Sequence, residues 1–410
     1  MFGRCARAGV AFALLLIFLV SCDKDPVYLK VTPVTVEKGD TARRTLLVYM
    51  MAENSLANYA SLDIAEIEEA VAAVPEDCRL FVYNDDSSFP TLHHYFKMSN
   101  GDTGSSVFHP FSNDVCSSDT ATLGALFDYI LKDYPTERLD IVLWSHGDGW
   151  LRAPLGISPH RSIGIDNGNN SYSNNVTATI EMEGLAALLK RLPARVDRLL
   201  FDACFMQCAE LAYALRSSAE WIIASPAEIP AYGALYSAVI PEFFHSEGPE
   251  SIIDAYIKGY ENEPAGAVLS AVHAPSMQHL ADVTYSYVNK YFNKDKKRDY
   301  VDVFSYLPGG KYTGSKTYPA YYDMNAVMAK YLAADEYEAW HLAFASAVRY
   351  VAASKCWYSA IRSSAIAFDS VNGGGLSMYM PQRYSSHSQF NADFSTTEWY
   401  SAAGWDAAGW

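Results

Sequence analysis

The chain has 410 residues, of which 50% are hydrophobic and 14% aromatic, enough for a large core in two domains or in one elaborated domain. Its formal net charge is −16 and its pI is near 5.0, and it has no basic patch, which argues against a nucleic-acid partner. An acidic protein repels acidic substrates and weakly attracts cationic ones.

The first 22 residues are typical of an export signal. Arg4 and Arg7 precede an apolar stretch, residues 8–20, that is too short to span a bilayer comfortably. Its end, Leu-Val-Ser-Cys, resembles the lipobox of bacterial lipoproteins, in which the cysteine, here Cys22, is lipidated and becomes the mature N-terminus. An ordinary cleaved signal and an uncleaved anchor are the alternatives. The expected location is the cell envelope, with a lipid anchor in a membrane and a periplasmic or cell-surface position.

The segment after Cys22 and the cysteine count add two expectations. Residues 23–44 are polar, contain two prolines and show no period, so they predict a tether. Five cysteines follow the leader: Cys78, Cys116, Cys204, Cys208 and Cys356. An odd number with these spacings forms no dense disulfide framework, so at least one thiol stays free or pairs outside the chain.

Beyond the tether, short apolar runs alternate with amphipathic helical patterns. The predicted strands occupy 45–51, 78–85, the start of 138–150, 196–204 and the start of 220–230, and the predicted helices occupy 61–74, 122–134, 181–192 and 208–218. This alternation favours an α/β fold with a mostly parallel sheet covered on both faces. In such sheets function lies at the carboxyl ends of the strands.

After about residue 274 the alternation loosens. A charged run at 293–299 is most simply a solvated loop, 336–354 predicts a long helix, and 373–381 predicts a strand. We therefore expect a catalytic domain at 45–273 and a C-terminal extension, 274–410, packed on the sheet.

His146 and Cys204 each follow an apolar strand, with a predicted helix between them. Neighbouring strands lie about 4.8 Å apart, so two strand-end side chains can face each other across one crevice. A cysteine attacks as a thiolate, which an adjacent imidazole and a helix N-terminus both favour. Because a helical pattern follows Cys204, its backbone N–H, together with that of Gly147, could stabilise an oxyanion.

The two motifs and their surroundings resemble the clostripain family of cysteine peptidases. The resemblance rests on "LWSHGDGW" (143–150) and "LLFDACFMQCAE" (199–210), and extends to "YMMAENSL" (49–56), "SPAEIPAYG" (225–233), "GLSMYMP" (375–381) and "EWYSAAGW" (398–405). It covers essentially everything after the tether. The family belongs with the caspase, legumain and gingipain group.

The resemblance implies a caspase-like α/β/α sandwich and a peptidase that cuts protein or peptide substrates after Arg or Lys. In that interpretation Cys204 is the nucleophile that forms a thioester and His146 is the general base and acid. Two alternatives stay open on the sequence. One is an amidase or transpeptidase that uses the same thiol, and the other is a non-catalytic binding lipoprotein on the same fold.

Asp202 is the leading candidate for the pocket that binds the basic side chain. Residues two apart in a strand share a face, so Asp202 should lie below Cys204 in the crevice, where a carboxylate pairs with Arg or Lys. The alternative is a carboxylate that ties a loop by accepting backbone N–H bonds. Asp148, Asp166 and Glu228 are further candidate acids.

Residues 152–177, between the two motifs, are rich in Gly, Pro, Ser and Asn and predict an exposed loop. Relatives in the clostripain family cut themselves in the corresponding loop. This implies self-cleavage after Arg161 or, less favoured, Arg152, and the alternative is a stable single chain.

No metal or other cofactor is expected from the sequence. The second cysteine of "CFMQC", Cys208, lies on the apolar face of the predicted helix and is expected to be structural, and no Cys or His pair accompanies it at zinc-ligand spacing. Some relatives use calcium, but the sequence contains no EF-hand loop that would support a calcium site.

Overall fold

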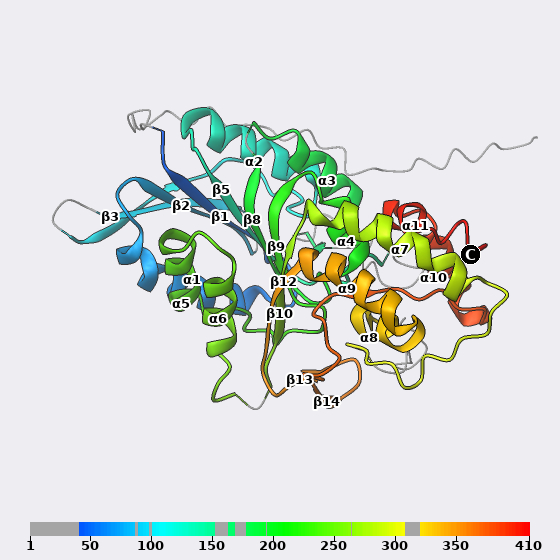
Figure 1. The fold of residues 1–410 in the computed structure, drawn as a ribbon. Coiled ribbons are helices and arrows are strands. Elements are labelled where there is room, and N and C mark those ends of the chain that lie inside the picture. Colours follow the sequence, from blue (N-terminus) through cyan, green and yellow to red (C-terminus); the bar gives the residue numbers. More distant parts are fainter. Residues whose placement is uncertain are drawn as a thin grey trace, which may run out of the picture.

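The computed structural model describes residues 41–86, 89–97, 101–151, 163–168, 178–193, 195–263, 265–307 and 320–410. A nine-stranded sheet runs through the middle of the molecule, with helices on both faces (Figure 1). The strands, in spatial order, are β12 (Val348–Ala353), β10 (Val268–His273), β9 (Ala219–Ala224), β8 (Val196–Asp202), β5 (Leu139–Trp144), β1 (Arg44–Met51), β2 (Cys78–Asp85), β3 (Thr91–Lys97) and β4 (Thr103–Phe108).

The five central strands, from β9 to β2, are parallel, and the outer strands on both sides are antiparallel. All eight residues of β1 and of β2 are buried, as expected for parallel strands covered on both faces. The mostly parallel α/β fold predicted from the alternating pattern is confirmed.

Two helical layers cover the sheet (Figure 1). One face carries α1 (Ala57–Ala70), α5 (Tyr236–His245) and α6 (Glu250–Lys258), and the other carries α2 (Thr120–Asp133), α3 (Met182–Lys190), α4 (Ala209–Ala214), α7 (Ser276–Phe292) and α9 (Ala334–Ala347). Successive strand residues enter opposite cores: Leu47 lies with the α2 side, and Leu46 and Val48 lie with the α1 side.

The part of the chain after residue 274 shares the sheet and the core with the part before it. Its strand β12 forms an edge of the sheet, and α7 and α9 pack in the same core as α4. Its smaller elements are β11 (Tyr322–Asp323), α8 (Met324–Tyr331), β13 (Cys356–Ser359), β14 (Ser364–Ala367), β15 (Ser377–Met378), α10 (Ser388–Phe394) and α11 (Glu398–Ala402). The boundary at 273 stays a prediction.

The single helix predicted over 336–354 is wrong in its last third. Helix α9 ends at Ala347, and Val348–Ala353 runs antiparallel to β10 as β12. Val348, Tyr350 and Val351 favour an extended backbone, and the open edge of β10 offers them main-chain partners. The helical period of the sequence carries no information about that edge.

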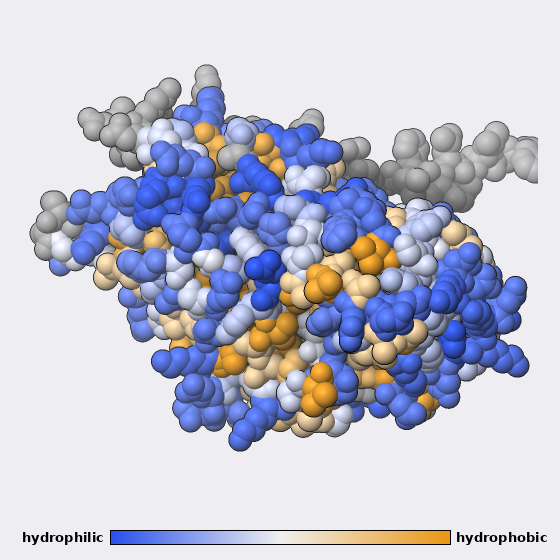
Figure 2. All heavy atoms as spheres, viewed as in Figure 1, coloured by the Kyte–Doolittle hydropathy of each residue, from blue (hydrophilic) through white to orange (hydrophobic). Residues whose placement is uncertain are grey.

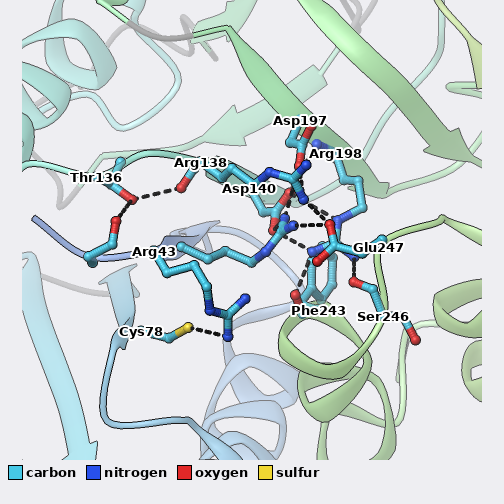
Figure 3. Close-up of polar contacts among 12 residues, drawn as sticks. Arg43, Cys78, Thr136, Arg138, Asp140, Asp197, Arg198, Phe243, Ser246 and Glu247 are labelled. Carbon is cyan, nitrogen blue, oxygen red and sulfur yellow. Dashed lines mark hydrogen bonds and ion pairs between the residues drawn. The ribbon is translucent and has the colours of Figure 1, made fainter.

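A network of buried charges lies at the amino ends of the central strands (Figure 3). Asp140 of β5 lies between Arg44 of β1 and Arg198 of β8, at N–O distances of 2.7 and 2.6 Å, and all three side chains are fully buried. Asp197 and Glu247 reach Arg44 from the more exposed side, at 3.1 and 3.2 Å. Each buried charge in the network therefore has an opposite charge next to it.

Hydrophilic residues cover most of the face drawn in Figure 2, and apolar residues show mainly in its central and lower part. Within the described ranges, no helix combines the length and the apolar character that a membrane span needs.

Candidate active site

The ends of β5 and β8 bring His146 and Cys204 to the same edge of the sheet. The two strands pair in parallel up to Trp144 opposite Asp202, and His146 and Cys204 each follow two residues after this last pair. Gly147 lies against the Cys204 carbonyl. A Cβ on residue 147 would be 2.9 Å from that oxygen, closer than side chains approach in proteins, so this contact needs glycine.

The Cys204 thiol lies half-buried next to the loop that follows β9. The Ile229 N–H points at Sγ from 3.4 Å, and the Ile229 carbonyl lies 3.8 Å from it. The chain then turns sharply, because Phe205 has a φ of +59°, which non-glycine residues rarely adopt. The Phe205 N–H donates to Ala227 O at 2.9 Å, and its ring stacks on Tyr321 with centroids 4.4 Å apart.

The helix expected directly after Cys204 begins later, at Ala209. Cys208 precedes it with an extended backbone (φ −122°, ψ 151°), and its side chain is fully buried in the core. The reason is Gln207, whose amide donates to Ser270 O at 2.7 Å and to Ile222 O at 3.3 Å and so fixes this segment across the strand ends. A helix N-terminus directly at Cys204 therefore does not contribute to thiolate formation.

Burial raises the pKa of the Cys204 thiol to about 12, and the nearby acids Glu228, Asp148 and Asp202 act in the same direction. The Ile229 N–H has a smaller, opposite effect on this pKa. At neutral pH the resting side chain is therefore a thiol, and a base must take its proton before the sulfur can attack.

The side chain of Ser55 contacts the His146 ring. The Ser55 hydroxyl lies 2.9 Å from His146 Nε2. Ser55 follows β1, and the preceding Asn54 fixes this turn by donating from its amide to Met51 O at 2.8 Å and to Ile165 O at 2.7 Å. Ser55 was not predicted as a site residue, although it lies in the motif "YMMAENSL", which is the signal that could have identified it.

Asp202 lies below Cys204 and is 3% exposed. Its Oδ2 accepts hydrogen bonds from Ala234 N–H at 3.0 Å and Tyr236 OH at 2.9 Å, and its Oδ1 accepts one from Tyr256 OH at 2.7 Å. Burial raises the pKa of its carboxyl, and these three donors oppose that shift. In this structure Asp202 thus holds the segment 233–236 against the strand.

Two acids of α1 lie near Asp202. Asp63 Oδ2 accepts a hydrogen bond from the Trp144 indole at 2.7 Å, and burial together with the charge of Asp202 raises the Asp63 pKa to about 8. Glu66 accepts from Tyr236 N–H at 2.8 Å, and its pKa is raised mainly by burial. The donors that contact these carboxylates and Asp202 in the described part of the chain are hydroxyl, indole and amide groups, none of them cationic.

The other candidate acids take separate positions. Glu228 accepts from the backbone N–H groups of Ala360 and Ile361, at 3.0 and 3.2 Å, and so holds the turn between β13 and β14. Asp148 is half-buried beyond His146, near enough to raise the Cys204 pKa. Asp166 is buried at the end of β6 (Ile163–Asp166), which pairs with β7 (Ala178–Ile180), and accepts from Ser117 N–H at 2.6 Å.

Three of the predicted sites lie outside the described residues. They are the lipidation site Cys22 and the two self-cleavage sites, Arg152 and Arg161. Of the cysteines within the described ranges, Cys78, Cys116, Cys204, Cys208 and Cys356 are all thiols without a disulfide.

Comparisons with known proteins agree on one family. A sequence profile of the clostripain family matches residues 48–410. A secreted C11 cysteine protease from Bacteroides thetaiotaomicron, solved with an irreversible peptide inhibitor, is 27% identical, with a TM-score of 0.75 over 89% of this chain and 100% of that one. The inactive zymogen of a C11 protease from Parabacteroides distasonis is also 27% identical, with a TM-score of 0.74 over 89% of this chain and 99% of that one.

The curated proteins contain no significant match to the chain. The profile nevertheless spans nearly the whole described structure, and both solved relatives are cysteine proteases that align over almost their entire length. The caspase-like α/β fold expected from the resemblance is confirmed by these structures. The chain belongs to the clostripain family of C11 cysteine peptidases.

Proposed function

We propose that the protein is an exported, lipid-anchored endopeptidase that cleaves protein or peptide substrates after Arg or Lys. The observation that supports the proposal is the parallel pairing of β5 with β8, since a histidine and a cysteine each follow two residues after the last strand pair, next to buried acids. Cys204 is the nucleophile, and His146 is the general base and acid.

The first half-reaction forms a thioester. The imidazole of His146 takes the proton of the Cys204 thiol, and Sγ bonds to the carbonyl carbon of the scissile peptide. The negative charge that develops on the carbonyl oxygen is stabilised by the backbone N–H groups of Gly147 and Cys204. The C–N bond then breaks, and protonated His146 gives its proton to the leaving amine.

The second half-reaction releases the product acid. His146, neutral again, takes a proton from water as the water oxygen attacks the thioester carbon. The C–S bond breaks, and the sulfur takes the proton back from His146 to regenerate the thiol. The high pKa of Cys204 supports this order, because a resting thiol depends on the imidazole in every turnover.

Charge supports the preference for basic side chains. Asp202 and Asp63 lie together below the cysteine with neutral donors around them, so a substrate guanidinium or ammonium would supply the missing positive charge. Three donors already use most of the roughly four acceptor positions of the Asp202 carboxylate. Since Asp202 is also 3% exposed, the segment 233–236 must shift before a basic side chain can reach it.

Such a shift fits activation by self-cleavage, which we place after Arg161 or Arg152. The relative from Parabacteroides distasonis is an inactive zymogen, which supports the idea that a chain of this family can rest in a closed form. Export is supported by the signal at residues 1–22 and by the relative from Bacteroides thetaiotaomicron, which is a secreted protease. Cys22 is the proposed lipid attachment site.

A panel of short peptides that end in Arg, Lys, Asn or Asp before a fluorogenic leaving group tests the activity. Wild type should release the fluorophore from the Arg and Lys peptides, and Cys204→Ala and His146→Ala should each reduce this rate by on the order of 10⁴-fold or more. Cys78→Ala is the matched control, because Cys78 begins β2 at the opposite end of the sheet. Full activity of Cys204→Ala would refute the assignment, and turnover of the Asn or Asp peptides alone would refute the basic preference.

Mass spectrometry tests the processing steps separately. Wild type should appear as two chains divided after Arg161 or Arg152, with a diacylated Cys22 at the N-terminus, whereas Cys204→Ala should keep the lipid but remain one chain. If uncut wild type cleaves the Arg peptide at full rate, activation by self-cleavage is wrong and the peptidase assignment stands.

A further inference from the structure

A buried acid that the proposed chemistry does not use, Glu210, lies on the helix that follows Cys204. It stands in the first turn of α4, and its side chain has no exposed surface. Its Oε1 accepts the N–H of Tyr379 at 2.8 Å, and the Cys208 side chain also hydrogen-bonds its carboxyl group. Burial raises the pKa of this carboxyl to about 7, and these two partners oppose the shift. The donors that reach Glu210 in the described part of the chain are therefore neutral, although a buried acid is costly without a cation.

Cys208 connects Glu210 to the turn that follows His146. Gly149, in this turn, has a φ of +63°, and a Cβ on it would lie 3.3 Å from Cys208 Sγ, so the turn packs directly on the sulfur. Burial raises the pKa of the Cys208 thiol well above its ordinary value, and the Trp150 N–H opposes this shift, because it points toward the sulfur. The Cys208 side chain thus lies between the Glu210 carboxyl and the backbone of the turn.

Tyr379 reaches the same turn from the C-terminal part of the chain. Its ring packs on the Trp150 ring with centroids 4.8 Å apart, and both side chains are buried. Because Glu210 accepts the backbone N–H of Tyr379, it also fixes the position from which this ring contacts Trp150. One carboxyl group therefore holds Trp150 from two sides, through Cys208 and through Tyr379.

Glu210 lies too deep to act on a substrate directly. It and its neighbours Cys208, Trp150 and Tyr379 are all buried, so any effect on catalysis must pass through the backbone that they hold. That backbone leads directly to the proposed catalytic groups, because the turn 147–150 begins next to His146.

We propose that Glu210 is a positioning residue of the peptidase reaction. Through its two hydrogen-bond partners it fixes the turn 147–150 relative to Cys204. It thereby sets where the His146 imidazole and the Gly147 N–H lie when the thiol attacks and the oxyanion forms. A misplacement of such groups by about 1 Å can cost on the order of 100-fold in rate. The inference rests on the proposed catalytic roles of Cys204 and His146.

The first measurement is kcat and KM of the full chain with the fluorogenic Arg peptide. Glu210→Ala removes the acceptor of the Tyr379 N–H, so kcat should fall on the order of 10- to 100-fold while KM changes less than about threefold. Glu210→Gln keeps a side-chain oxygen that can accept the same N–H and should restore most of the rate. A merely structural role predicts a lower Tm with an unchanged kcat per folded molecule.

Alkylation of Cys204 by iodoacetamide gives a second readout that needs no substrate. Mass spectrometry of the peptide that contains Cys204 follows the reaction, so the other thiols do not contribute. Because His146 takes the thiol proton, a displaced imidazole should slow alkylation on the order of tenfold in Glu210→Ala and much less in Glu210→Gln.

Two further variants guard against a loss of folding. If Glu210→Ala does not fold, Glu210→Asp decides, because it keeps the charge while its carboxyl is one methylene too short to reach the Tyr379 N–H, and its kcat should fall several-fold with KM nearly constant. Asp140→Asn is the matched control, since Asp140 is a fully buried acid at the opposite ends of the strands. It should lower Tm and leave kcat and the alkylation rate unchanged.

The outcomes separate this inference from the proposed function. If wild type cleaves the Arg peptide, and folded Glu210→Ala or Glu210→Asp does so with the same kcat and the same alkylation rate, Glu210 is a packing residue and the inference is wrong. If wild type cleaves no peptide and His146→Ala alkylates as fast as wild type, the proposed function fails, and the inference fails with it.

Discussion

The two ends of the central sheet differ in how their buried charged side chains are paired. At the amino ends, Arg44 and Arg198 enclose Asp140, and the three fully buried charges are paired directly (Figure 3). At the carboxyl ends the buried charges are mostly acids: Asp202 and Asp63 lie below the cysteine, Glu53 follows β1, and Asp85 is the last residue of β2. The donors that contact them in the described part of the chain are neutral hydroxyl, indole and amide groups.

The difference suggests two roles for buried charge in this molecule. The paired charges at the amino ends hold strands together, whereas the acids at the carboxyl ends can bind a ligand. A closed ion network holds strands together and needs nothing from outside, although its net contribution to stability is small once desolvation is counted. Buried acids without a cation lower stability by themselves, so they mark the places where a ligand can supply the missing charge. In this molecule the acids below Cys204 mark the proposed substrate pocket.

Removing the Asp140 carboxylate should disrupt the ion network at the amino ends of the central strands and leave the acids at their carboxyl ends in place. Asp140→Ala leaves Arg44 and Arg198 buried without their shared partner, so we expect the free energy of unfolding to fall by about 3–5 kcal/mol. Urea unfolding measures it. Asp197→Asn is the control and should cost less than about 1 kcal/mol, because Asp197 is partly exposed. A similar loss in both variants would mean that the network is not closed around Asp140.

The pH dependence of stability tests whether Asp63, at the carboxyl ends of the strands, is buried without a cationic partner. Its folded-state pKa is about 8 and its ordinary value is 3.8, so the folded state holds a proton that the unfolded state has lost. The stability from this group is present below about pH 4 and disappears as pH rises through 8, with a slope of at most about 1.4 kcal/mol per pH unit. Asp63→Asn should remove its part of this slope and be more stable than wild type at pH 8.

Thermal unfolding between pH 5 and 8.5 compares the two proteins. If wild type and Asp63→Asn lose stability in parallel over this range, Asp63 is already ionised in the folded state, and the unpaired character of this end rests on other acids.

The parts of the fold that follow local patterning could be predicted from the sequence, and those that depend on distant partners could not. The apolar runs ending at Trp144 and Asp202 were predicted as strands, and they are β5 and β8. Two predictions were wrong because the local pattern does not show which distant groups a segment contacts. The helix predicted directly after Cys204 is excluded by the hydrogen bonds of the Gln207 amide, and the helix predicted over 348–353 is excluded by strand pairing with β10.

The acids show the same limit. Asp202 could be singled out because it is two residues from Cys204 in one strand, whereas the Tyr236 and Tyr256 hydroxyls that bind it come from α5 and α6. Glu53, Asp85 and Asp114 are about 30 residues apart in sequence, so no linear motif reveals an acidic cluster that forms only when β1 and β2 pair.

The variant Asp202→Asn tests whether the acid below Cys204 binds the basic side chain of the substrate. The amide keeps an acceptor for the segment 233–236 but removes the charge that would pair with Arg or Lys, so kcat/KM for basic peptides should fall roughly 10- to 100-fold. Alkylation of Cys204 by iodoacetamide, which needs no basic side chain, should change much less. Glu228→Gln is the control, because that acid holds a backbone turn. An unchanged preference for basic peptides in folded Asp202→Asn would leave Asp202 as a carboxylate that only ties a loop.

The smallest expected effect concerns Ser55, whose hydroxyl contacts the proposed catalytic histidine. Its hydroxyl lies 2.9 Å from His146 Nε2 and is held by the turn that begins at Glu53. Ser55→Ala removes a group that orients the imidazole without touching the sulfur, so kcat should fall roughly 3- to 10-fold while KM stays nearly constant. Ser55→Thr keeps the hydroxyl and should restore most of the rate. A purely structural role predicts a lower Tm with an unchanged kcat per folded molecule, so measuring both quantities in both variants distinguishes a positioning residue from a packing one.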